Sequence, residues 1–145
     1  MDELHDPLRH LLFRLASRFR SGILRCNWRS LSLPTLRDFP RGACGDASLL
    51  LAKYLQVQRC GLAHYVLGGR AGLPHAWLQL HGFVVDITAD QFDDQVAGVI
   101  VSADSSWHCS FHGKIHSPAD FCLYDRETVF KLTHAYRQIS SHLDS

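Results

Sequence analysis

A cysteine in this chain occurs in a context that suits a nucleophile. Cys44 follows Pro40-Arg41-Gly42-Ala43 and opens a stretch, to about Gln58, in which apolar residues recur every three or four positions. Such spacing predicts a helix. A thiol at a helix N-terminus loses its proton more readily, because free N–H groups and the helix dipole favour negative charge. The same N–H groups can hold an oxyanion. A buried core cysteine is the alternative interpretation.

A histidine and an aspartate follow in two runs typical of neighbouring strands, 75–80 and 83–88, separated by His81-Gly82. A two-residue turn places Trp77 opposite Asp86 and leaves His75 diagonal to that carboxylate, on the same face. The carboxylate would then orient the imidazole and stabilise its cation. A three-residue turn would move Asp86 to the other face. Taken singly, the two residues also fit a half-buried histidine and a strand-end carboxylate bonded to the backbone.

Three more residues are candidates for contact with a substrate. Gly45 adjoins Cys44 and leaves room for a substrate carbonyl. Trp77 lies between His75 and the following polar positions, where it either walls a cleft or fills the core. Gln91 follows the second strand and either lines the mouth of that cleft or belongs to an ordinary turn.

The stretch 103–119 is rich in Ser, His, Asp and Gly and is predicted to be a loop. His108, Cys109, His112 and His116 offer possible metal ligands, but their spacing matches no common zinc module. We therefore expect no metal site and no cofactor. The loop is interpreted either as a lid over an active site or as a plain surface loop.

The remaining pattern predicts an α+β fold in a single domain, residues 1–145. Helices are expected over 7–20, 44–58 and 126–143, with an irregular segment at 21–43. Strands are expected over 63–67, 75–80, 83–88 and 96–102, with a weaker candidate at 120–124. The order, helices before a small antiparallel sheet and then a closing helix, places Cys44 on a helix packed against the strands that carry His75 and Asp86.

Composition and charge limit the classes of partner and the cellular compartment that we expect for this protein. The net charge is +1, and the five cysteines form no paired spacing, which favours a reducing compartment and a cytoplasmic location. No apolar run is long enough for a membrane span, and the charged N-terminus does not resemble a secretory signal, although signal-independent export stays open. The arginines of the N-terminal third are interpreted as a solvated face, so no nucleic-acid partner is expected; a patch for nucleic acid or an acidic partner is the alternative. The oligomeric state is left open.

The motifs together resemble the transglutaminase-like branch of the papain-like cysteine enzymes. The likeness covers about residues 39–92: FPRGACGDAS at 39–48, VLGG at 66–69, HAWL at 75–78 and VDIT at 85–88. It implies that Cys44 is the nucleophile, His75 the base and Asp86 the residue that orients the base. Papain-type enzymes carry a glutamine six residues before the cysteine as an oxyanion donor, whereas this chain has Asp38. Asn27, Trp28 or a backbone N–H is left as the candidate donor.

These residues predict a thiol-dependent hydrolase, a peptidase, amidase or deamidase, that acts on a peptide or protein amide through an acyl-enzyme. An amine acceptor in place of water would make the protein a transglutaminase-like acyl transferase. Two non-catalytic alternatives also stand: a binding module that keeps the fold, and an interaction domain that uses the basic N-terminal helix.

Overall fold

A computed structural model describes residues 6–27 and 33–143 of the chain. Trp28 and Arg29, both considered above, lie outside these residues. Four α-helices occur in the described part: α1 (Pro7–Arg25), α2 (Cys44–Val57), α3 (Ser106–Cys109) and α4 (Arg126–Ser140). The 3-10 helices are η3 (Pro34–Leu36), η4 (Ala89–Gln91) and η5 (Phe121–Leu123).

Local sequence accounts for the long helices. The Asp6 side chain accepts hydrogen bonds from the N–H groups of Leu8 and Arg9 and so caps α1. The Asp125 carboxylate accepts from the Thr128 N–H and caps α4 in the same way. Each helix turns an apolar stripe inward, and the stripe of α1 is Leu12, Leu15, Ala16, Phe19, Gly22 and Ile23.

Five antiparallel strands form one sheet in the order β4-β3-β2-β1-β5. Their bounds are β1 (His64–Arg70), β2 (Leu73–Leu80), β3 (Phe83–Asp86), β4 (Ile100–Ser102) and β5 (Lys114–Pro118). His81 and Gly82 both have positive φ, 52° and 82°, as a two-residue type I′ turn requires. The register pairs Leu80 with Phe83 and Leu78 with Val85. The predicted α+β class and the predicted hairpin register are confirmed.

Several local predictions were wrong. The segment predicted to be irregular from residue 21 continues α1 as far as Arg25, and the strand predicted over 96–102 is confined to β4. The stretch predicted as a loop contains the short helix α3 and the edge strand β5. Strand β5 has no alternating apolar pattern, since most of its side chains are exposed, and its pairing with β1 holds it in place. The weak strand candidate at 120–124 is instead η5, which the Asp120 carboxylate caps through the Cys122 N–H.

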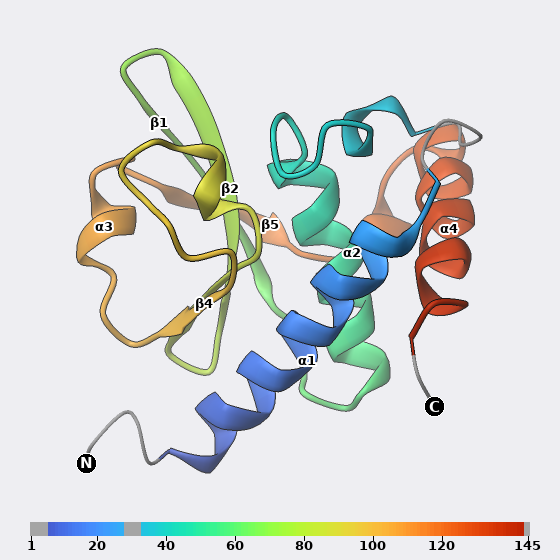
Figure 1. The fold of residues 1–145 in the computed structure, drawn as a ribbon, viewed down its shortest axis with the longest axis horizontal. Helices are drawn as coiled ribbons and strands as arrows, with labels where there is room; N and C mark the ends of the chain where they lie inside the picture. Colours follow the sequence, from blue (N-terminus) through green and yellow to red (C-terminus); the bar gives the residue numbers. More distant parts are fainter. Residues whose placement is uncertain (1–5, 28–32, 144–145) are drawn as a thin grey trace.

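The sheet separates two unequal layers. Helices α1, α2 and α4 gather on one side of it, while the segment that carries α3 lies on the other (Figure 1). The helix side buries the larger apolar cluster, to which β2 contributes Ala76, Leu78 and Leu80. The opposite face buries a smaller cluster of Val66, Trp77, Val84 and Phe111. Alternate residues of the same strands therefore face two different environments.

A glycine in β1 lets the α3 segment lie directly on the sheet. A Cβ atom at Gly68 would stand 2.4 Å from the carbonyl oxygen of Phe111 and 2.9 Å from the Cα of Gly113. The neighbouring Gly69 N–H donates to that same Phe111 carbonyl at 2.8 Å. Backbone therefore contacts backbone at a distance that no side chain would allow.

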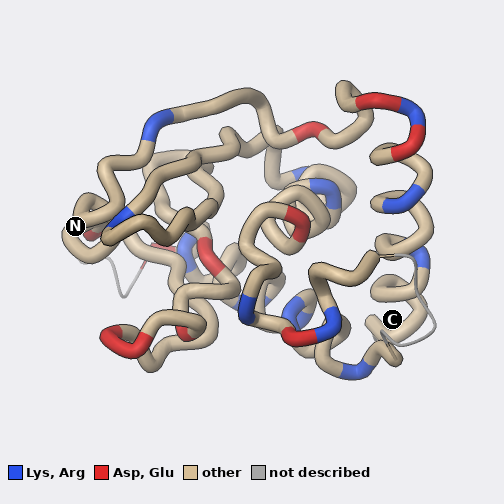
Figure 2. Tube along the Cα trace, turned by 90° about the horizontal axis from the view of Figure 1, so that it is seen from above, with Lys and Arg blue, Asp and Glu red and all other residues tan. Residues whose placement is uncertain are grey.

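Charge is dispersed over the molecule. Basic and acidic positions are scattered along the trace, and α4 carries both kinds (Figure 2). Over the described residues, no helix combines the length and the apolar character that crossing a bilayer demands.

Candidate functional site

Cys44 is the first residue of α2, as predicted. Ala43 is the N-cap residue of α2, and its side chain makes no capping hydrogen bond. The first N–H groups of any helix lack intrahelical acceptors. The Cys44 side chain is partly exposed. A partly accessible thiol at the positive end of a helix of 14 residues has the environment that a nucleophile needs.

His75 and Asp86 meet as the hairpin register predicts. The His75 Nε2 atom lies 2.7 Å from Asp86 Oδ2, and the side chains are 0% and 1% exposed. Because a carboxylate oxygen accepts, Nε2 carries the proton and donates it to Asp86. The other ring nitrogen, Nδ1, is then the acceptor.

Nδ1 of His75 faces the candidate nucleophile. The side-chain amide of Gln91 lies 3.4 Å from this atom, and the ring also interacts with the Cys44 thiol. Gln91 belongs to η4 and is only partly buried. The structure therefore brings Cys44, His75, Asp86 and Gln91 together. The tautomer imposed by Asp86 leaves the proton-accepting nitrogen on the side of the sulfur.

The surroundings shift both pKa values. Burial by itself lowers the pKa of His75, but hydrogen bonds to Asp86 and to Cys44 outweigh it and raise the pKa to about 9. Burial raises the pKa of Asp86, but hydrogen bonds from His108 and His75 outweigh it and lower the pKa to about 2. The two groups therefore favour an imidazolium beside a carboxylate at neutral pH.

Asp86 accepts from more donors than His75. Its Oδ1 atom accepts from the Thr88 N–H at 2.9 Å, as the alternative interpretation of Asp86, a strand-end carboxylate bonded to the backbone, predicts. Its Oδ2 atom lies 2.7 Å from Nε2 of His108, and that side chain is 3% exposed. His108 was considered in the sequence only as a metal donor in an irregular segment. No periodic pattern could have linked it to a carboxylate 22 positions earlier.

Within residues 6–27 and 33–143, one buried group could hold a metal ion, namely His75, Asp86 and His108, whose donor atoms lie within 4.8 Å of one another. Zinc in a tetrahedral site, with bonds of about 2.0–2.1 Å, keeps neighbouring ligand atoms roughly 3.3 Å apart. Both nitrogen-to-oxygen distances here are 2.7 Å, which is the length of a charge-assisted hydrogen bond. The donors thus match a hydrogen-bonded array. Cys109, His112 and His116 do not join this group.

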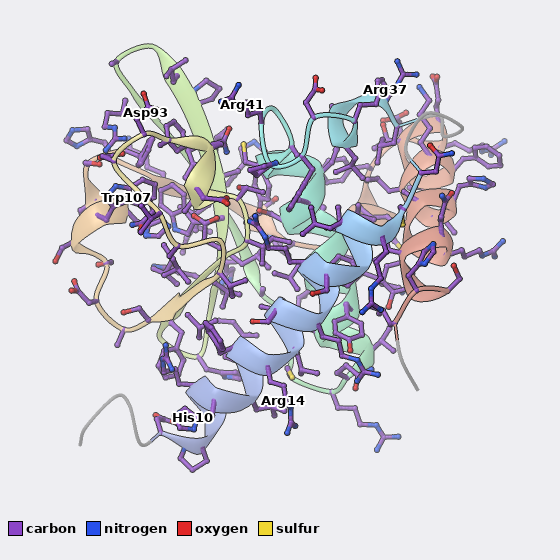
Figure 3. All side chains as sticks on the ribbon, viewed as in Figure 1. His10, Arg14, Arg37, Arg41, Asp93 and Trp107 are labelled. Atoms are coloured by element: carbon purple, nitrogen blue, oxygen red, sulfur yellow. The ribbon has the colours of Figure 1, made fainter. Side chains whose placement is uncertain are left out.

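Aromatic rings enclose the array. Around the His75 ring lie those of Trp77, Phe92, Trp107, His108 and Phe111, with centroids 5.0–6.1 Å away. Trp107 lies among the side chains on the α3 side of the sheet, whereas Arg14 extends from α1 away from the body of the molecule (Figure 3). Trp77 is 4% exposed and belongs to this buried cluster. Core filling therefore accounts for Trp77, and its contact with a substrate stays a prediction.

A tyrosine that the sequence did not single out covers the first turn of α2. A Cβ atom at Gly45 would stand 3.1 Å from the hydroxyl oxygen of Tyr65. Burial raises the pKa of Tyr65 to about 12, and the negative charge of Cys44 adds to this effect. The small size of Gly45 thus admits a phenolic donor beside the thiol. In the sequence, the one sign of this contact is a tyrosine within a predicted strand, and such a strand can pack against the helix that begins at Cys44.

Asn27, one candidate oxyanion donor, lines a surface hollow with Leu36, Asp38 and Phe39. Cys44 is not among the residues that line this hollow. Trp28, the other side-chain candidate, lies outside the described residues. Tyr65 places a hydroxyl donor next to Gly45 in the first turn of α2, whereas the Thr35 hydroxyl, which also reaches that turn, donates to Asp46.

One arginine of the basic N-terminal third does not lie on a solvated face. Arg20 donates from both of its terminal nitrogens to Asp90 at 2.8 and 2.9 Å, and to the carbonyls of Ile87 and Gly98 at 2.6 and 2.8 Å. Its side chain is 15% exposed. The guanidinium therefore fastens to α1 the segment that carries Gln91. The solvated-face prediction was wrong for this residue.

Comparison of the chain with protein-family models, with curated proteins and with solved structures found no match. The likeness to transglutaminase-like enzymes stays a prediction from the motifs at 39–92. The site is therefore argued from its own geometry.

Proposed function

We propose that this protein is a thiol-dependent hydrolase that cleaves an amide bond through an acyl-enzyme on Cys44. The observation that carries the proposal is the orientation of His75: its Nε2–H is bound to a buried carboxylate, and the ring, whose pKa is raised, interacts with the thiol, so Nδ1 can take the Cys44 proton and hold it as the imidazolium. A histidine held by a carboxylate beside a thiol in the first turn of a helix is what nucleophilic catalysis requires.

The steps follow from these positions. The Cys44 proton passes to Nδ1 of His75, and the sulfur attacks the amide carbon, forming a carbon–sulfur bond. N–H groups at the start of α2 and the Tyr65 hydroxyl hold the oxyanion. His75 then returns the proton to the nitrogen as the carbon–nitrogen bond breaks. Water, activated by the same histidine, cleaves the thioester and releases the acid.

The substrate is proposed to be a peptide or protein amide, in line with the family that the motifs resemble. Gly45 and Gln91 border the reacting sulfur and base and are proposed to contact the substrate. An amine that replaces water in the last step would give transfer in place of hydrolysis, and this alternative is an outcome of the turnover experiment below.

Thiol labelling tests the activation of Cys44. Cys109 and Cys122 are exposed, whereas Cys44 is only partly so; accessibility alone therefore predicts that these two react first. With limiting iodoacetamide at pH 6, where ordinary thiols are protonated, we expect Cys44 to be alkylated first, as read by intact mass and peptide mapping. The His75→Ala variant should lose this order. Labelling of Cys109 or Cys122 ahead of Cys44 would contradict the proposal.

Turnover tests the reaction itself. A library of peptide amides, incubated with and without a small primary amine, should give a free acid or an amine adduct identified by mass spectrometry. The Cys44→Ser variant should form neither product, and the matched Cys122→Ser variant should behave like the parent. Hydrolysis without adduct supports the hydrolase, and adduct formation supports the transferase. An activated Cys44 that turns over nothing supports the binding module.

A further inference from the structure

The Asp86 carboxylate lies between two histidines that donate to the same oxygen. Nε2 of His75 and Nε2 of His108 are each 2.7 Å from Oδ2. The reaction above requires only the first of these donors. The second is buried and polar, in a position surrounded by aromatic rings that an apolar side chain would fill without a hydrogen-bonding requirement.

Several contacts hold His108 in place. Its ring centroid is 4.8 Å from that of Trp77 and 4.8 Å from that of Trp107. The Phe111 N–H donates to the His108 carbonyl at 3.1 Å. These contacts fix both the ring and its backbone.

A second set of contacts fastens the same short helix from outside. The Trp107 indole N–H donates to Asp94 at 3.1 Å, and Arg70 binds both Asp94 and the Ser110 hydroxyl. Because α3 has only four residues, its position depends on such contacts and not on its own stability. His108 is therefore presented to Asp86 by a fastened segment.

The carboxylate needs this second donor for a physical reason. Asp86 is 1% exposed, and burial favours its protonated form. His108 contributes the larger of the two hydrogen-bond effects that lower its pKa, ahead of His75. During the reaction His75 alternates between neutral and protonated forms, whereas His108 stays bound to Oδ2 from the other side. Two ion pairs flank the array: Arg20–Asp90, where Arg20 also binds the Ile87 carbonyl, and Arg70–Asp94, where Asp94 also binds Trp107.

We propose that His108 is a positioning residue, the fourth member of the Cys44–His75–Asp86 array, which keeps the Asp86 carboxylate charged and oriented throughout turnover. The inference rests on the proposed function and assigns a role to a residue of the same site. His108 acts through Asp86 and does not itself touch the reacting atoms.

The test compares three substitutions at one position. The His108→Gln variant keeps an N–H near the position of Nε2. The side chain of the His108→Asn variant is too short for its amide to reach Asp86, and the His108→Phe variant keeps a ring of similar volume without a donor. His134→Phe, on the exposed face of α4, is the matched control. All variants also carry Cys109→Ser and Cys122→Ser, so that alkylation of these exposed thiols does not contribute to the measured rate.

The readout is the pH profile of Cys44 alkylation between pH 5 and 9. In the Phe and Asn variants the thiolate should form only at higher pH, and the rate at pH 6 should fall about tenfold for each unit of that shift. His108→Gln should keep a rate within a few-fold of the parent, and His134→Phe should not change it. Unchanged profiles in the Phe and Asn variants, or a Gln variant as slow as Phe, would overturn the inference.

A second measurement does not depend on how well the variants fold. In the parent protein, proton NMR with ¹⁵N-labelled histidine should show two imidazole Nε2–H signals protected from solvent exchange, one from His75 and one from His108. A single protected signal would overturn the inference. If Cys44 of the parent is no more reactive than Cys60, the proposed function fails as a whole; if Cys44 is activated but indifferent to His108, only the role of His108 fails.

Discussion

The two faces of the sheet differ in what they bury. On the helix side, β2 contributes Ala76, Leu78 and Leu80 to a continuous apolar core. On the other side, the same strand contributes His75, next to a carboxylate and a second histidine, all at most 3% exposed. One strand therefore supplies stability with alternate residues and chemistry with the residues between them.

The difference teaches where substitutions should act. Apolar contacts on the helix side stabilise the fold in proportion to the area they bury. Polar groups on the α3 side give up hydrogen bonds to water when they bond to one another, so each bond adds little net stability. Together these bonds fix the relative positions of the polar side chains. Truncation of apolar helix-side residues should therefore change stability with intact chemistry, and substitution of Asp86 in the polar array should mainly change the chemistry.

The largest effect is expected from Asp86→Asn on the α3 side. The amide has one accepting oxygen in place of two, so it cannot accept from Thr88 on one side and from both histidines on the other, and an amide N–H that faces His75 favours the wrong tautomer. Turnover of an amide substrate should fall about 10³–10⁴-fold, measured as kcat. A loss smaller than tenfold in the folded variant would remove Asp86 from the array.

Leu78→Ala tests the opposite face. Leu78 is 0% exposed against the helices, so its truncation should lower the free energy of unfolding by about 2–5 kcal/mol, measured by urea denaturation. Leu67→Ala, at a position 40% exposed, is the control and should cost less than 1 kcal/mol. Reactivity of Cys44 per folded molecule should stay at the parent level; a large drop would show that the two faces are not separable.

Tyr65→Phe tests the donor that reaches the nucleophile from the helix side of the sheet. Loss of one oxyanion donor reduces kcat by about 10²-fold, and the retained ring should preserve stability to within about 1 kcal/mol. Steady-state kinetics with thermal denaturation separates the two effects. A kcat equal to that of the parent would show that Tyr65 does not stabilise the oxyanion and that backbone N–H groups alone do so.

Arg20→Met tests the bond between the helices and the segment that carries Gln91. Removal of the guanidinium leaves two carbonyls and Asp90 without their donor, so the free energy of unfolding should fall by roughly 2 kcal/mol. Arg18 is exposed and lies two residues earlier on α1, so the Arg18→Met variant should leave the free energy of unfolding nearly unchanged. Limited proteolysis should cut within 87–98 only in the Arg20 variant; equal resistance of both variants would contradict the fastening role.

The smallest effect is a pH dependence. The pKa of His75 is raised to about 9 from its ordinary 6.5, so its protonated form, which supplies the leaving amine, persists to alkaline pH. Turnover should be halved near pH 9. The stability that this charge contributes is complete below about pH 6.5 and is lost as pH rises through about 9. The His75→Gln variant should lack that loss, and a turnover limb near pH 6.5 would contradict the shift.

Short-range rules account for what was predictable. The two-residue turn at His81-Gly82 set the parity of β2 against β3, and parity placed His75 and Asp86 on one face. Helical spacing after Gly42 placed Cys44 at the start of α2. Each inference used positions close in sequence or joined by one hairpin.

The remainder depends on long-range contacts. His108 reaches Asp86 from a segment without periodicity, and Arg20 reaches Asp90 across 70 positions. Both residues were read as surface or loop residues because neither pattern nor composition shows what lies across the molecule. A sequence of mixed polar residues at 103–119 does not reveal that the polar side chain of His108 turns inward.

The close approach at Gly68 has a consequence for tolerance to variation. Since even an alanine there would force apart β1 and the turn that follows His108, a scan of all single substitutions should mark Gly68 as intolerant although it contacts neither Cys44 nor a substrate. The α3 segment could then not shift away from β1 without rebuilding the strand, which makes it an integral layer of the domain.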